Sequence, residues 1–122
     1  MEKKKILIVD DEEDILHTVS FRLESEGYQC ILSKEGLDAI AKARKETPDL
    51  ILLDIMLPKM NGYKVCRLLK FDAKYKHIPI LMLTAKTQEA DLITGLECGA
   101  DGFITKPFEM ESLLDTIRSF TK

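Results

Sequence analysis

Short β-type runs alternate with longer amphipathic stretches along the whole chain, and this alternation limits its fold more than any other feature. The β-type runs are residues 6–9, 28–32, 50–53, 80–83 and 103–104. Between them, apolar residues recur at the spacing of one helix face. Strands that alternate with helices indicate βαβ units around a parallel sheet. We therefore expect the 122 residues to form a single α/β domain over positions 1–122.

Right-handed crossovers allow few arrangements of five such units. We expect a flavodoxin-like (βα)5 doubly wound parallel sheet with strand order 2-1-3-4-5. The residues predicted to face the core from the five successive helices are Ile15, Leu16, Val19 and Leu23; Leu37, Ile40 and Ala41; Val65, Leu68 and Leu69; Leu92, Ile93 and Leu96; and Leu113, Leu114, Ile117 and Phe120. Gly27 and Gly99 are expected to end the first and fourth helices.

Three aspartates follow two of the predicted strands. Asp10 and Asp11 come directly after residues 6–9, and Asp54 comes directly after residues 50–53. In the expected strand order these two strands are neighbours, and their carboxyl ends meet at the edge of the sheet where ligands bind. Three clustered carboxylates repel one another unless a cation lies among them. The sequence therefore predicts a divalent metal site.

The ends of the last two strands complete a recognisable set of residues. Thr84-Ala85 follows the fourth strand, and Lys106-Pro107-Phe108 follows the fifth. Together with the three aspartates, these residues resemble the receiver domain of two-component response regulators, over essentially the whole chain. The resemblance implies a phosphorelay signalling domain, which catalyses its own phosphorylation and slow dephosphorylation and is not otherwise an enzyme.

The resemblance also implies a role for each acidic residue. Asp54 would be the phosphoacceptor. Asp11, Asp54 and the backbone carbonyl of Met56 would bind Mg²⁺, or Mn²⁺ in its place, with Asp10 acting through a metal-bound water. Hard oxygen ligands and several retained waters suit Mg²⁺.

Three further residues would bind the phosphoryl group, namely Thr84, Ala85 and Lys106. Asp54, Lys106 and Thr84 would form the catalytic set, because a carboxylate attacks phosphorus readily when its charge is screened. The resemblance implies a cis Lys106-Pro107 peptide. It also implies a switch in which Thr84 moves toward the phosphoryl group, Phe103 rotates inward, and the face of the fourth helix, fifth strand and last helix changes.

Two departures from the family pattern bear on how long the phosphoryl group persists. Met56 and Lys86 occupy the positions two residues beyond Asp54 and Thr84, where the family tunes access of the hydrolytic water. Neither side chain is an amide or a carboxylate that could orient that water, so we expect a long-lived phosphoryl group.

Composition limits the partners and the compartment. Lys and Arg number 18 against 21 Asp and Glu, a net charge of −3, which disfavours direct nucleic-acid binding. No stretch approaches the length of a transmembrane helix, and no export signal is present, so a cytoplasmic protein without membrane contact is expected. Cys30, Cys66 and Cys98 lack the spacing of a zinc site or disulfide framework, and are interpreted as small packing residues.

The resemblance implies a sensor histidine kinase or phosphotransfer protein as the phosphoryl donor. A downstream protein or a fused effector domain would receive the signal. We also expect a dimer that depends on phosphorylation. Gly102 and Thr116 stand where receivers of winged-helix transcription factors usually carry charged residues for dimer contacts. A stand-alone receiver and one domain of a larger regulator both remain open.

Three rival functions fit parts of the pattern. An aspartyl-phosphate phosphatase would need a second aspartate where Met56 stands. A nucleotide- or flavin-binding module would need a glycine-rich phosphate loop after a strand, and none of the predicted strands is followed by one. A receiver that only mediates contacts would not need the acidic set and Lys106.

Overall fold

The computed structural model describes residues 3–85 and 98–122 and contains one five-stranded parallel sheet in the order β2-β1-β3-β4-β5. The strands are β1 Lys5–Val9, β2 Gln29–Ser33, β3 Leu50–Asp54, β4 Ile80–Ala85 and β5 Gly102–Lys106. The described helices are α1 Glu13–Ser25, α2 Gly36–Glu46, α3 Gly62–Lys70 and α5 Met110–Phe120. The predicted flavodoxin-like strand order is confirmed, and the residues predicted for the fourth helix, Leu92, Ile93 and Leu96, lie outside the described ranges.

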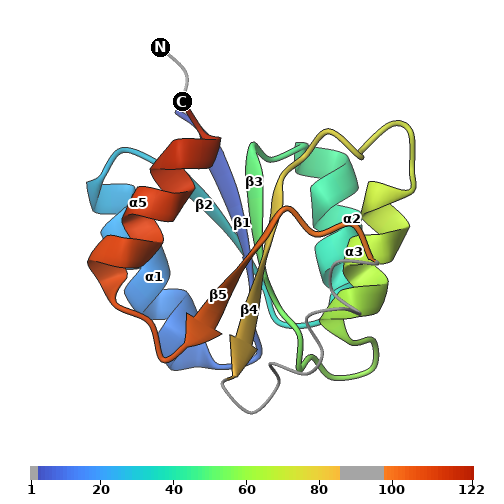
Figure 1. The fold of residues 1–122 in the computed structure, drawn as a ribbon, viewed down its shortest axis with the longest axis horizontal. Helices are drawn as coiled ribbons and strands as arrows, with labels where there is room; N and C mark the ends of the chain where they lie inside the picture. The colour runs from blue at the N-terminus through green and yellow to red at the C-terminus, as the bar shows by residue number, and fades with distance from the viewer. Residues whose placement is uncertain (1–2, 86–97) are drawn as a thin grey trace.

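Helices cover both faces of the sheet. Helices α1 and α5 lie on one side, and α2 and α3 lie on the other (Figure 1). Each side encloses its own apolar cluster, because successive side chains of a strand point to opposite faces. Leu7 and Val9 of β1 pack toward α2 and α3, whereas Ile6 and Ile8 pack toward α1 and α5.

Strands β1 and β3 are apolar along almost their whole length, because helices cover both faces of the sheet. Every residue of β3, including Asp54, is buried, and so are the last four residues of β1. A strand covered on both faces needs a continuous apolar run, and the runs at 6–9 and 50–53 supply it. Strand β3 ends at Asp54, and Asp10 directly follows β1, so the core holds the backbone of these acidic residues in place.

The predicted inward faces of three helices were partly wrong. In α2 the buried residues are Gly36, Ala39, Ile40 and Ala43, whereas Leu37 is 58% exposed and Ala41 is also exposed. These buried positions are spaced as one helix face, i, i+3, i+4 and i+7, which leaves Leu37 and Ala41 on the solvent side. In α3 Leu68 is 41% exposed, and in α5 Phe120 is 37% exposed.

The two glycines expected to end helices have left-handed backbones. Gly27, with φ 96°, follows the end of α1, as predicted. Gly99 has φ 90°, although the helix that it was expected to end lies outside the described residues. Among the helices that the structure describes, none has the length and hydropathy to cross a membrane.

Candidate functional site

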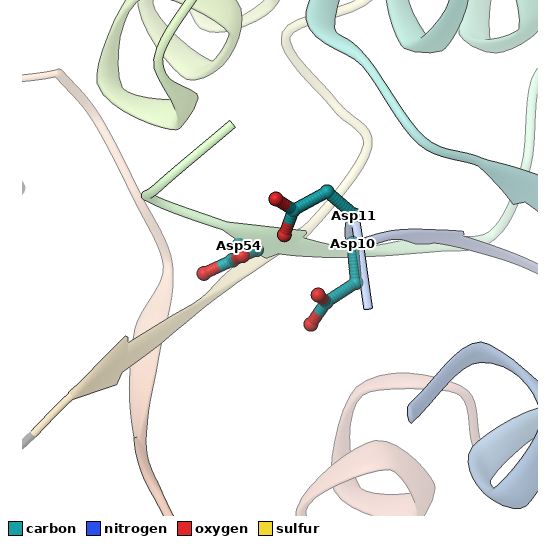
Figure 2. A group of neighbouring side chains, drawn as sticks. All are labelled: Asp10, Asp11 and Asp54. Carbon is teal, nitrogen blue, oxygen red and sulfur yellow. The ribbon is translucent and has the colours of Figure 1, made fainter. Parts of the chain in front are cut away.

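Three carboxylates meet at the carboxyl ends of β1 and β3. The two strands pair in parallel with Val9 opposite Leu53, so the residues that follow them, Asp10 and Asp54, lie at the same level of the sheet. Carboxylate oxygens of Asp10, Asp11 and Asp54 all lie within 4.8 Å of one another (Figure 2). Asp10 is fully buried, Asp54 is 4% exposed and Asp11 is exposed. The cluster predicted from the strand ends is therefore present.

Asp10 is held from two sides. Its Oδ1 accepts a hydrogen bond from the Glu12 backbone N–H at 2.9 Å, and its Oδ2 accepts one from Lys106 Nζ at 2.7 Å. A buried carboxylate needs such partners, because an unpaired charge loses its hydration without compensation. Asp10 is thereby oriented, and Asp11 is left at the mouth of the site.

Lys106 reaches the acidic cluster from β5. Its Nζ lies 2.7 Å from Asp10 Oδ2 and 3.5 Å from Asp54 Oδ1, and its side chain is 16% exposed. Burial works against the charged ammonium, but the hydrogen bond that Lys106 donates to Asp10 and the charge of Asp54 outweigh it and raise the pKa of Lys106. The Lys106-Pro107 peptide is cis, as the family resemblance implied. Lys106 thus faces two of the three clustered aspartates, Asp10 and Asp54.

Asp54 has an unusual protonation equilibrium. Burial raises its pKa to about 6, the charges of Asp10 and Asp11 add to the increase, and the charge of Lys106 opposes it. The Met56 backbone N–H lies 3.4 Å from Asp54 Oδ1 and also favours the charged form. An added cation would stabilise the ionised carboxylate, because it would offset the repulsion from the neighbouring aspartates.

Gly62 packs directly behind Asp54. A Cβ atom at this position would lie 2.3 Å from the Asp54 carbonyl oxygen, and the Gly62 N–H donates to the Ile55 carbonyl at 2.8 Å. An Asn-Gly pair such as Asn61-Gly62 is typical of a turn. Instead, Asn61 is the N-cap of α3, with its side chain accepting from the Lys64 N–H at 3.1 Å, and Gly62 is the first helical residue. No local sequence signal indicated that this glycine is needed for the approach of α3 to β3.

A cavity of about 230 Å³ opens over the carboxylates. It is lined by Asp11, Glu12, Asp54, Met56, Ala85 and Lys106. The Met56 side chain is 64% exposed at its rim. Glu12 lines the cavity as well and was not among the residues expected to bind the metal. The space is bounded by the ends of β1, β3, β4 and β5, as expected for the functional edge of this sheet.

Thr84 and Phe103 lie on one face of the sheet, toward the α2 and α3 side. Thr84 is opposite Thr105, and Met82 is opposite Phe103, in the parallel pairing of β4 with β5. Thr84 is 2% exposed and does not line the cavity, whereas Phe103 is half-buried against the apolar cluster. The other predicted tuning residue, Lys86, lies outside the described residues.

The donor set fits a small, hard divalent cation. Three carboxylates converge, only two of them face Lys106, and burial together with the charges of Asp10 and Asp11 raises the pKa of Asp54. Carboxylate oxygens are the ligands that Mg²⁺ prefers in proteins. His17 and His77 lie elsewhere on the surface, and no other group of three metal-ligating side chains occurs in residues 3–85 and 98–122.

Comparison with known proteins agrees with this geometry. The family model described as "Response regulator receiver domain" matches residues 6–118. The alkaline phosphatase synthesis transcriptional regulatory protein PhoP of Bacillus subtilis (strain 168) is 51% identical over 105 residues, which cover 86% of this chain and 43% of that protein. The chain thus spans about half the length of the curated relatives that it matches.

Solved structures share the whole fold. The chemotaxis response regulator CheY4 of Vibrio cholerae has a TM-score of 0.91 at 36% identity, with 98% of this chain and 99% of that chain covered. The receiver domain of the sensor histidine kinase PA1611 of Pseudomonas aeruginosa PAO1 has a TM-score of 0.89 at 28% identity, with 98% of each chain covered, and holds a magnesium ion in its active site cleft. The family match and the relatives show that the chain belongs to the response regulator receiver domains of two-component signalling systems.

Proposed function

We propose that Asp54 accepts a phosphoryl group from a sensor histidine kinase or phosphotransfer protein, in a reaction that depends on Mg²⁺. The observation that carries the proposal is the clustering of three carboxylates with Lys106, beside a small cavity that Asp11, Asp54 and Lys106 line. Asp54 borders this cavity, and it is the carboxylate with the raised pKa. The other three groups supply what a phosphoryl acceptor needs, namely ligands for a metal and a cation for the incoming charge.

Asp10, Asp11, Asp54 and the Met56 backbone carbonyl would hold Mg²⁺, with Mn²⁺ as a substitute. When bound, the cation neutralises the carboxylates and the equatorial phosphoryl oxygens. Asp10 is fully buried and already bonded to Glu12 and Lys106, which favours a contact through a metal-bound water. The exposed Asp11 is free to ligate directly.

In the transfer, an oxygen of the Asp54 carboxylate forms a bond to phosphorus while the bond between phosphorus and the donor imidazole nitrogen breaks. The imidazole leaves with the bonding electron pair, and no proton is taken from Asp54, which reacts as the carboxylate. Lys106 pairs with the phosphoryl oxygens, and Thr84 and Ala85 contribute a hydroxyl and a backbone donor at the end of β4. This assignment makes Asp54, Lys106 and Thr84 the catalytic set, with slow hydrolysis returning the free carboxylate.

We infer that the signal leaves the site through Thr84 and Phe103. Both lie on the same face of β4 and β5, two residues apart in register. Movement of Thr84 toward a phosphoryl group would open space on that face, and Phe103 would turn into it. The face formed by β5, α5 and the fourth helix predicted from the sequence would then change. When Thr84→Ala and the wild type are compared at equal phosphorylation, the variant should lose the gain in partner affinity on phosphorylation. Unchanged coupling in this variant would reject the route.

Residues 1–122 would thus act as the receiver domain of a cytoplasmic response regulator. The output would go to a downstream protein or to a fused effector domain. Formation of a phosphorylation-dependent dimer is one way in which this domain could produce that output. The curated relatives include proteins named as transcriptional regulators that are about twice as long as this chain. Direct nucleic-acid binding by this domain is not proposed, because its net charge is −3.

The test is intact-protein mass spectrometry after incubation with acetyl phosphate, with and without Mg²⁺. The wild-type chain should gain one acid-labile phosphoryl group only with Mg²⁺, and peptide mapping should place it on Asp54. Asp54→Asn should gain none, while Asp115→Asn, at an exposed position of α5, should label normally. Full labelling of Asp54→Asn would refute the assignment.

A further inference from the structure

Two cysteines that are far apart in sequence touch inside the protein. Cys66 lies in α3 and Cys98 lies 32 positions later, just before Gly99 and β5. The Cys66 thiol donates to the Cys98 carbonyl oxygen at 3.6 Å, and both residues are 0% exposed. Cys30, the third cysteine, lies on β2 and is only half-buried. The chain therefore contains one buried cysteine pair and one separate thiol.

The two sulfurs influence each other chemically. The hydrogen bond from Cys66 lowers the pKa of Cys98 to about 7, with burial opposing it, and the same contact raises the pKa of Cys66. The thiolate is the nucleophile in disulfide exchange, and its optimum pKa is close to ambient pH. Cys98 is thus the better attacking thiol. Cys66 is the neighbouring thiol that can then attack the mixed disulfide formed at Cys98.

A second contact ties the same two regions together. Lys70, about one helical turn after Cys66, donates to the Ile78 carbonyl at 3.0 Å and pairs with Asp101 Oδ2 at 2.9 Å. Asp101 Oδ2 also accepts from the Ile80 N–H at 2.8 Å. The backbone on both sides of the cysteine contact is therefore held against α3, which keeps the two thiols together.

We propose that Cys66 and Cys98 form a reversible disulfide by exchange with a low-molecular-weight disulfide of the glutathione class. The proposal does not depend on phosphoryl transfer, because it concerns a different cluster on the α3 side of the sheet. It assigns a modification site to Cys66 and Cys98, which the sequence by itself predicts to be small packing residues.

The exchange balances in two steps. Because both cysteines are buried, the reaction takes place when the contact between them opens locally. The Cys98 thiolate then attacks one sulfur of glutathione disulfide, a protein–glutathione disulfide forms, and one glutathione thiolate leaves. Cys66 then loses its proton to the solvent, and its sulfur attacks the Cys98 sulfur and displaces the second glutathione thiolate. Both glutathione thiolates take up protons, so two protein thiols are oxidised and one glutathione disulfide is reduced to two thiols.

The crosslink would act on β5. Cys98 lies four positions before Gly102, the first residue of the strand that carries Phe103 and Lys106. A covalent bond to α3 fixes the start of this strand and closes a loop across 32 positions. Closing a loop of this size restricts the unfolded chain and is expected to raise the Tm by about 5 °C or more.

The experiment uses Cys30→Ala as the background, because the free Cys30 could otherwise form glutathione adducts. The folded protein is incubated with glutathione disulfide, and free thiols are then blocked. Non-reducing peptide mapping should show a Cys66–Cys98 crosslink without bound glutathione, and the Tm should rise and return to its starting value after dithiothreitol. Absence of the crosslink after prolonged incubation, or a stable glutathione adduct in its place, would overturn the proposal.

Cys66→Ala in the same background is the matched control. It should give a glutathione adduct on Cys98, with no crosslink and no rise in Tm, because the resolving thiol is missing. If this variant does not fold, the peptide map of the Cys30→Ala protein still decides the question, since it requires no change at either proposed site. A crosslink that appears only under denaturing conditions counts against a native-state site.

Discussion

Lys106 Nζ lies 2.7 Å from Asp10 Oδ2, and this contact links β5 to β1 across the two strands between them. Asp10 has no exposure to solvent, so its charge depends on Lys106 and on the Glu12 N–H. The same ammonium lies 3.5 Å from Asp54 Oδ1. In the metal-free protein Lys106 is therefore a structural counter-ion as well as the group proposed to bind the phosphoryl oxygens.

Lys106→Met is expected to lower the free energy of unfolding of the metal-free protein by about 2–4 kcal/mol, because it leaves a buried carboxylate without its partner. Urea denaturation in the presence of a chelator measures the effect. Mg²⁺ should restore part of the loss. Lys59→Met is the control, since Lys59 is 71% exposed and pairs with Glu35 at 3.4 Å, and it should change the stability by less than about 1 kcal/mol. Equal losses in the two variants would contradict the structural role.

Asp54 should make the metal-free protein more stable as the pH falls. Its pKa is raised to about 6 in the folded protein, whereas an unfolded aspartate titrates near about 3.9. The folded state therefore binds this proton more tightly, and the destabilisation at neutral pH is relieved as the pH falls through about 6 toward about 4. Asp54→Asn should exceed the wild type in stability at pH 7 by about 1–3 kcal/mol, with a smaller difference at pH 5.

Urea denaturation of both proteins at several pH values, without metal, tests this expectation. Other groups titrate over the same range, but they are shared by the two proteins and cancel in the difference. Saturating Mg²⁺ should remove the advantage of the variant, because the wild-type carboxylate then has a cation beside it. A difference that stays constant between pH 5 and pH 7 would show that Asp54 has an ordinary pKa.

Gly62→Ala should disturb the phosphoacceptor strand. The added Cβ would lie 2.3 Å from the Asp54 carbonyl oxygen and 2.9 Å from Ile55 Cα, so α3 or the end of β3 must move. We expect a loss of about 2–4 kcal/mol in stability and weaker Mg²⁺ binding, measured by denaturation and by calorimetric titration. Gly27→Ala has open space but φ +96°, so it should lose about 1–2 kcal/mol and bind Mg²⁺ normally. Normal Mg²⁺ affinity in Gly62→Ala would disprove the proposed coupling.

Met56 should prolong the phosphorylated state. Its side chain is 64% exposed at the rim of the cavity and offers no group that could orient a water toward phosphorus. Met56→Asn should shorten the half-life of the phosphoryl group several-fold, as followed by mass spectrometry after the phosphodonor is removed. Met56→Leu keeps an apolar side chain of similar size and should leave the half-life close to that of the parent. A half-life in Met56→Asn as long as the parent's would refute this role.

Much of the fold could be predicted because strands buried on both faces need continuous apolar runs. Residues 6–9 and 50–53 satisfy that requirement, and the aspartates that follow them were expected at the same edge of the sheet. The helix faces were harder to predict. Leu37 and Leu68 are exposed although they are apolar, because the buried face of each helix is set by its packing in the whole fold and runs through neighbouring positions such as Ile40 and Leu69.

The sequence by itself determined the strand order, the edge at which the acidic residues collect and the family to which the chain belongs, because these follow from local periodicity and from residues at strand ends. The tertiary structure decided the contacts between distant positions. The Lys106–Asp10 pair, the approach of Gly62 to Asp54 and the Cys66–Cys98 contact each depend on how helices and strands pack in three dimensions. Such distances result from the packing of the whole core, and no local pattern of residue types specifies them.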